Sequence, residues 1–269
     1  MLRDIERYGV DHRSSFNLTP LMSAARAGNI ALVQLLLDRG ANPSLTANDG
    51  LAAYHHVLSV AVSTPRYAQQ KSAQLYTLLK PESLSLQVEG RLIKLDNRQM
   101  AMFLVNLMQA LFHSHLGSAL AFSEAFSATR LAEYVAHLPD ELLPERRKKR
   151  NYISRLLSQH EVNSRNPYGK KLFLRLNHGQ YILNPELKFR QGDTWYAVYE
   201  LQPPENLGCD LQTFLQGFPP GLADFRQIKR DFYERTEKII AYWVAVIRRT
   251  DQKRGDQVQQ NAVANSEEA

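Results

Sequence analysis

The 269-residue sequence contains a single cysteine, Cys209, and no apolar run long enough to form a membrane-spanning helix. One cysteine excludes an internal disulfide and a multi-cysteine zinc site. The first residues, Met1 to Arg7, lack the apolar core of a secretory signal. We therefore expect a cytoplasmic protein. Its 44% hydrophobic and 22% charged residues are typical of an ordinary globular chain.

The sequence also lacks the motifs of common enzymes. It contains no glycine-rich phosphate loop, no metal-binding helix motif and no nucleophile elbow. We expect His55 and His56 to be surface or packing residues of a helix rather than a metal pair. Cys209 lies between two proline breaks, with no partner histidine visible in the sequence. We expect a non-enzymatic protein without cofactor or metal, and an enzyme whose residues come from distant segments is the unsupported alternative.

Positive charge is concentrated in one segment of the chain. Residues 144–190 contain twelve basic and three acidic residues, a net charge of +9, whereas the whole chain carries +6. The remainder is therefore slightly acidic. A local basic excess of this kind is expected of a surface that binds a polyanion, nucleic acid first among candidates. A solvated helix start followed by a basic loop is the alternative.

Residues 17–42 have the pattern of two short helices joined by a tight turn. Thr19-Pro20-Leu21 is a helix start, with threonine as the cap and proline in the first turn. Gly28-Asn29 supplies the turn, and Gly40 suits the end of the second helix. Leu32, Leu35 and Leu36 are the expected buried stripe of that helix. This segment resembles an ankyrin repeat, in which Met22 occupies the place where the family usually has histidine.

Weaker copies of the same pattern flank this repeat. Ala52 follows Thr19 by the ankyrin period of 33 residues, but the leucine pattern near residues 75–79 follows only after 43, which predicts an insertion of about ten residues near Ser63–Arg66. Upstream, residues 5–11 resemble the end of a second repeat helix. Because ankyrin units need neighbours, we expect the chain to be the C-terminal part of a longer repeat protein or to descend from one. A partner-binding surface is the expected role, and a cap on the next domain is the alternative.

The segment after the repeats alternates between strand and helix patterns. Residues 85–95 predict a hairpin, and residues 97–115 a long helix capped by Asn97 with an apolar face that includes Phe103 and Leu107. A shorter helix is expected over 126–136 and a basic helix over 144–160. Residues 171–176 and 180–185 then predict two strands around a turn at Gly179.

The order of helix, helix, basic helix and hairpin resembles a winged helix-turn-helix domain, although the link over 137–144 is longer than usual. In that family the third helix enters the major groove and the wing contacts the adjacent backbone. On the basic helix, Tyr152, Ile153, Leu156 and Leu157 define the buried side. The resemblance implies that the following residues contact nucleic acid: Arg146, Arg147, Lys148, Arg150, Asn151, Ser154, Arg155, Ser158, Arg165, Lys170, Lys171 and Arg175.

The expected fold class is mainly α with a small β component: ankyrin helical repeats followed by an α+β winged helix. We expect partial, degenerate ankyrin repeats over residues 1–82, a winged-helix-like domain over 83–202, a helical extension over 203–250 and a disordered tail over 251–269. Residues 194–201 predict an aromatic core strand. The helix within the extension is expected to fold back on the core, and pairing with a second copy is the alternative.

These patterns predict two binding roles in one chain. The ankyrin segment is expected to bind a protein partner, and the basic winged helix to bind duplex DNA, as a regulator or mobile-element accessory factor. An adaptor or effector whose basic surface meets only acidic proteins is the alternative, because a fold does not determine a function.

Overall fold

The computed structural model describes residues 2–14, 17–47, 50–114, 125–177 and 179–198. All of these belong to one of the two compact units of the chain, formed by residues 1–115 and 123–218. The helical extension predicted over 203–250, the predicted tail and Cys209 lie outside the described residues. The predicted boundaries between domains stay predictions.

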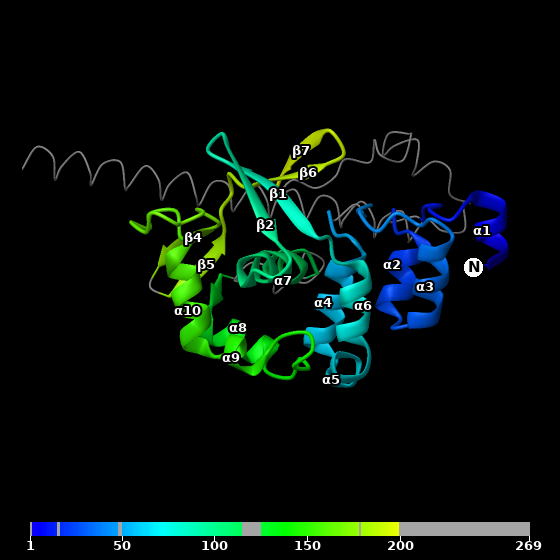
Figure 1. Cartoon of the computed structure of the whole chain (residues 1–269), viewed down its shortest axis with the longest axis horizontal. Helices are drawn as coiled ribbons and strands as arrows, with labels where there is room; N and C mark the ends of the chain where they lie inside the picture. Colours follow the sequence, from blue (N-terminus) through cyan, green and yellow to red (C-terminus); the bar gives the residue numbers. More distant parts are fainter. Residues whose placement is uncertain (1, 15–16, 48–49, 115–124, 178, 199–269) are drawn as a thin grey trace, which may run out of the picture. The chain divides into compact units, whose positions relative to one another are not determined.

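The N-terminal part is a row of short helices (Figure 1): α1 (Leu2–Tyr8), α2 (Pro20–Arg26), α3 (Ile30–Asp38) and α4 (Ala53–Ser63). The predicted cap of α2 is present, because Thr19 Oγ1 accepts a hydrogen bond from the Met22 amide at 3.2 Å. Gly28 and Gly40 have φ values of +69° and +85°, as their places in turns require. Of the predicted stripe on α3 only Leu36 is buried; Val33 is buried in place of Leu32 and Leu35, which are half-buried.

The predicted insertion separates α4 from α6 (Ala73–Leu79). It contains α5 (Pro65–Tyr67) and a π-helical turn, η1 (Ala68–Ser72). Tyr67 packs this insertion against the first repeat, because its hydroxyl donates a 2.5 Å hydrogen bond to the carbonyl oxygen of Ala25. A Cβ at Gly28 would lie 3.0 Å from the Tyr67 ring. The insertion therefore fills space that the turn at Gly28 leaves open.

Two antiparallel sheets follow the helices. The strands β1 (Ser83–Val88) and β2 (Arg91–Asp96) form the predicted hairpin, and β6 (Lys188–Gln191) and β7 (Thr194–Ala197) extend it in the order β2-β1-β6-β7. The sequence did not predict β6. The second sheet has the order β3-β5-β4, from β3 (Phe126–Ser127), β4 (Phe173–Asn177) and β5 (Gln180–Leu183). Gly179 in the β4–β5 turn has the expected positive φ, +73°.

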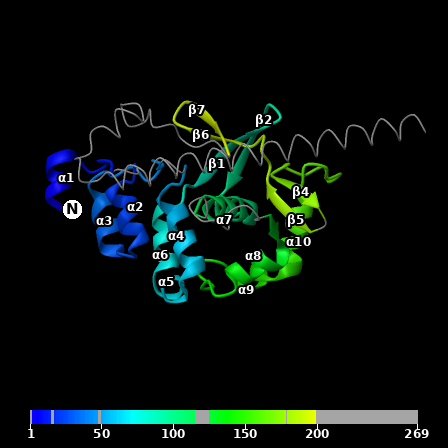
Figure 2. The ribbon, with the colours of Figure 1, turned by 180° about the vertical axis from the view of Figure 1, so that it is seen from behind.

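The helix α7 (Met100–Ser114) occupies the centre of this unit, between α4 on one side and β5 on the other (Figures 1 and 2). It begins three residues after the predicted cap Asn97, because Asp96 ends β2 and its side chain accepts from the Arg98 amide in a turn. Every residue from Met100 to Phe112 is buried. The predicted apolar face is therefore buried together with the opposite face, which carries Asn106 and Gln109.

The two predicted helices after α7 are shorter than expected. The first is α8 (Ala128–Val135), because Phe126 and Ser127 pair with β5 and Ser127 caps the helix. The predicted helix over 144–160 is two helices, α9 (Glu145–Lys148) and α10 (Arg150–Gln159), separated at Lys149, whose ψ of 131° is extended. Ile153 and Leu157 are buried as predicted, whereas Tyr152 and Leu156 are half-buried.

Helices combined with antiparallel strands confirm the mixed character of the expected fold class. The predicted aromatic strand is shorter than expected, since β7 ends at Ala197 within the described residues and Trp195 and Tyr196 are half-buried. No helix in the described part of the chain is both long and apolar enough to cross a membrane.

Buried histidine makes the repeat segment sensitive to acid. His56 on α4 is 5% exposed, and burial, assisted by the charge of Arg26, lowers its pKa to about 4. The unfolded chain therefore takes up a proton at higher pH than the folded chain. Unfolding by urea should become easier as the pH falls from about 6.5 to about 4, with a contribution from His56 on the order of 3 kcal/mol.

The variant His56→Leu should lose the part of this dependence that His56 contributes, because leucine does not titrate. Its free energy of unfolding, measured in urea at pH 7 and pH 4.5, should differ less between the two values than that of the parent chain. If the variant and the parent chain show the same difference between the two pH values, the lowered pKa of His56 is wrong. His160, whose burial lowers its pKa to about 4, contributes to the dependence that remains.

Candidate functional site

Side chains of the repeat segment accept hydrogen bonds from backbone amides at the helix starts and in the loops. At the first repeat the Thr19 amide donates to the sulfur of Met22 at 3.4 Å, so the sulfur stands where the family usually has a histidine nitrogen. At the second repeat that place is occupied by His55, whose Nδ1 accepts from the Ala52 amide at 3.1 Å. Asp11 accepts from the Asn42 amide at 3.1 Å and joins two successive loops. His55 and His56 are packing residues, as expected.

The first part of the predicted basic surface is partly used inside the fold. Lys148 on α9 is 8% exposed and its Nζ lies 2.8 Å from Asp140 and 3.4 Å from Glu145. Glu145 also pairs with Lys149, and its hydrogen bond to Lys149 is the largest cause of its lowered pKa. Lys148 is therefore a structural residue, contrary to the exposed position expected for it. Arg147 is half-buried and donates to the Arg98 carbonyl oxygen at 3.1 Å.

The predicted polar side of α10 is divided between solvent and the sheet. Asn151 and Arg155 are exposed and Ser154 is half-buried. The Arg155 guanidinium lies 5.8 Å from the centre of the Tyr152 ring. Ser158 instead faces the sheet, with its hydroxyl 3.2 Å from that of Tyr181 on β5. Of the predicted polar side of α10, only the part before Ser158 therefore faces solvent.

The three basic residues predicted to hold the wing to phosphate contact other parts of the chain. Lys170 donates to the Gln99 side chain at 2.7 Å, and burial lowers its pKa. Lys171 pairs with Glu89 at 2.5 Å, in the turn of the β1–β2 hairpin. Arg175 on β4 donates to the Tyr181 hydroxyl at 2.6 Å. Lys170 and Lys171 therefore join the start of β4 to neighbouring parts of the fold, and Arg175 joins the two strands of the hairpin.

Four of the arginines predicted to contact nucleic acid are exposed: Arg146, Arg150, Arg155 and Arg165. In the ranges described, no carboxylate lies within 4.0 Å of any of their guanidinium groups. Arg150 is oriented by a hydrogen bond from its Nε to the Thr129 hydroxyl of α8 at 3.0 Å. Exposed arginines with unused donors can bind an external anion, because the guanidinium fork matches phosphate and carboxylate.

Several partners of this surface were not predicted. Tyr181 accepts from Arg175 and contacts Ser158, and Glu89 pairs with Lys171 from 82 residues away. The strand predicted over residues 180–185 includes Tyr181, but the sequence did not indicate that the Tyr181 hydroxyl would contact α10. Such contacts depend on how distant elements pack. Among the described residues, no group of three histidine, cysteine, aspartate or glutamate side chains is placed to hold a metal ion.

Comparison with known families identifies one part of the chain. Residues 8–57 match the family described as ankyrin repeats (many copies). No curated protein and no solved structure matches the chain. The match confirms the predicted ankyrin resemblance over this segment. Because ankyrin repeats stack into binding surfaces, it implies a protein-interaction module.

Substitutions of Lys148, which is buried, and Arg146, which is exposed, should change the free energy of unfolding by different amounts. Lys148→Ala removes a buried aliphatic stem and two ion pairs, so it should lower the free energy of unfolding by about 1–2 kcal/mol. Arg146→Ala removes an exposed side chain and should change it by less than about 0.5 kcal/mol. Urea unfolding monitored by circular dichroism measures both. Equal effects of the two substitutions would contradict the placement of Lys148.

Proposed function

We propose that the protein is a non-enzymatic, cytoplasmic interaction protein that binds a protein partner through its ankyrin segment and duplex DNA through α10 and the hairpin β4–β5. The DNA part rests on one set of exposed arginines on and around α9 and α10: Arg146, Arg150, Arg155 and Arg165. None of them pairs with a carboxylate from the part of the chain that the structure describes. Phosphate contacts of this kind supply most of non-specific DNA affinity.

The arrangement of elements supports a winged helix. α7, α8 and α10 precede the hairpin β4–β5, in the order expected from the sequence, and the short strand β3 pairs with β5. Ser158 and Tyr181 bring the end of α10 against the hairpin. In this proposal α10 presents Asn151 and Arg155 to the major groove, while Arg150 and Arg165 contact phosphates.

A protein-only adaptor is the second candidate. Lys148 and Lys171 are already neutralised by carboxylates of the same chain, which leaves fewer positive groups for phosphate than the sequence predicts. The same four arginines can instead bind an acidic protein surface. The two candidates differ in whether binding requires nucleic acid.

The experiment compares two double variants that each remove two positive charges. Arg150→Ala with Arg155→Ala changes the proposed surface, and Arg91→Ala with Lys94→Ala changes exposed residues of β2 as the matched control. Binding to a fluorescent duplex is measured by anisotropy over a range of salt concentrations. The first variant should bind at least about 10-fold more weakly, because it loses a groove contact and a phosphate contact. Its log–log salt slope should fall by about 0.9, the contribution of the one phosphate contact that Arg150 makes.

The control should bind like the parent chain. If the parent chain does not bind the duplex, or if both double variants bind as tightly as it does, the DNA proposal is wrong. Capture of a protein that persists after nuclease treatment, in the absence of duplex binding, would favour the adaptor.

A further inference from the structure

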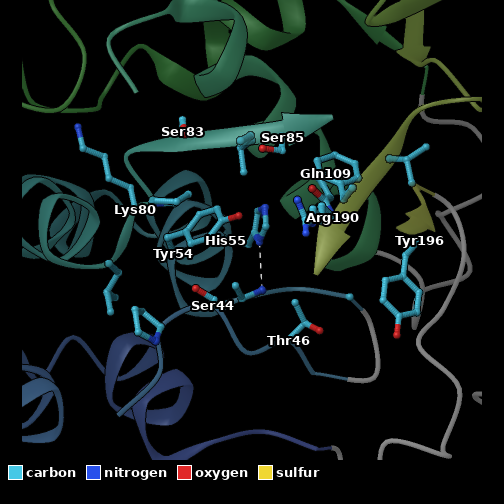
Figure 3. Close-up of a pocket in the computed structure, with 18 of the residues that line it drawn as sticks. Ser44, Thr46, Tyr54, His55, Lys80, Ser83, Ser85, Gln109, Arg190 and Tyr196 are labelled. Carbon is cyan, nitrogen blue, oxygen red and sulfur yellow. Dashed lines mark hydrogen bonds between the residues drawn. The ribbon is translucent and has the colours of Figure 1, made fainter. Parts of the chain in front are cut away.

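A cavity of about 380 Å³ lies away from α10, beside the loops of the repeat segment. Its wall comes from the loop before α4, the first turn of α4, the end of α6, the start of β1, one residue of α7 and the strands β6 and β7 (Figure 3). This volume is within the roughly 300–1,000 Å³ typical of small-molecule sites. Neither the ankyrin pattern nor the basic surface assigns a role to it.

One buried amide oxygen in the wall has no hydrogen-bond partner among the described residues. Gln109 of α7 is 6% exposed, lines the cavity, and its Oε1 accepts no hydrogen bond from the described residues (Figure 3). A buried polar group without a hydrogen-bond partner lowers the free energy of unfolding by roughly 1–3 kcal/mol. Most buried polar groups in proteins therefore have a partner, which can be a bound molecule. The Oδ1 of Asn106 on the same helix is also unsatisfied, so it is the place of Gln109 in the cavity wall that points to a ligand with a hydrogen-bonding edge.

Two aromatic rings line the same cavity from neighbouring strands. Phe189 on β6 and Tyr196 on β7 are directly opposite each other in the antiparallel register, so their side chains lie on one face of the pair. Both residues are half-buried. Partly exposed rings of this kind provide a flat apolar surface on which a heterocycle can stack.

The charge of the wall is positive. Lys80 and Arg190 line the cavity, and none of its described lining residues is an aspartate or glutamate. Arg190 contacts the Asp193 carboxylate at 3.2 Å, but that carboxylate is fully exposed, so the pair is weak and exchangeable. The hydroxyls of Ser44, Thr46 and Ser83 add hydrogen-bonding groups. An anionic ligand is favoured.

We propose that this cavity binds a mononucleotide. The base stacks on Phe189 and Tyr196 with its edge at the Gln109 amide, and the phosphate is held by Lys80 or Arg190. A nucleotide combines the three features that the wall complements: a flat ring, a planar donor–acceptor edge and a negative group. Glutamine amides pair with a base edge through two hydrogen bonds. The site is independent of the proposed DNA surface.

The experiment titrates AMP, GMP, CMP and UMP separately into the full chain by isothermal calorimetry. At least one of them should bind saturably. Gln109→Leu should weaken that binding by about 5- to 100-fold, the range for losing one such pair. Its melting temperature should not fall, because leucine removes an unsatisfied amide from the interior. Lys80→Gln should weaken binding several-fold at low salt, while Lys94→Gln, on the exposed side of β2, should not.

Three results would overturn the proposal. The first is the absence of saturable binding by all four nucleotides up to about 10 mM, which is too weak for a specific pocket. The second is binding unchanged by both Gln109→Leu and Lys80→Gln. The third is binding that is lost in the Arg150→Ala, Arg155→Ala chain but kept in Gln109→Leu, which would place the nucleotide on the DNA surface instead.

Discussion

The complete burial of α7 is the constraint on which the rest of this unit depends. A helix that is buried on all sides needs neighbours on all sides, and here they include α4 of the repeat segment, β2 of the hairpin and β5 of the second sheet. Aromatic rings also join α7 to the repeat segment, since Tyr76 of α6 lies edge-on to Phe103 of α7 with the ring centres 6.0 Å apart. The last repeat helices therefore have a second role as a wall of the central core.

Because α7 is buried, the polar side chains that it carries depend on hydrogen-bond partners inside the protein. Asn106 donates to the Tyr76 hydroxyl at 3.3 Å, and burial raises the pKa of Tyr76 to about 12, so that this contact is neutral at physiological pH. Gln109, one turn further along, lines the cavity, and the side-chain oxygens of both amides accept no hydrogen bond from the described residues. The two amides therefore differ in their surroundings, because Asn106 contacts Tyr76 inside the core whereas Gln109 lines the cavity of the proposed ligand.

The basic segment illustrates how packing divides one charge cluster into two classes. Lys148, Lys170, Lys171 and Arg175 stabilise contacts between elements, whereas Arg146, Arg150, Arg155 and Arg165 remain exposed. A basic sequence does not distinguish these classes, because whether a side chain meets a carboxylate depends on residues as distant as Glu89. The number of positive groups available to a polyanion is therefore smaller than the net charge suggests.

Local pattern determined the capped helix at Thr19, the turns at Gly28, Gly40 and Gly179, and the two hairpins, because capping, positive φ and alternation depend on neighbouring residues. It also placed the insertion after Ser63. Tertiary structure decided where the long basic helix breaks at Lys149, that β6 joins β1, and that Gln109 meets a cavity. Each of these depends on contacts between residues far apart in the chain, such as the pairing of Lys148 with Asp140 or of Leu86 with Phe189, which periodicity does not encode.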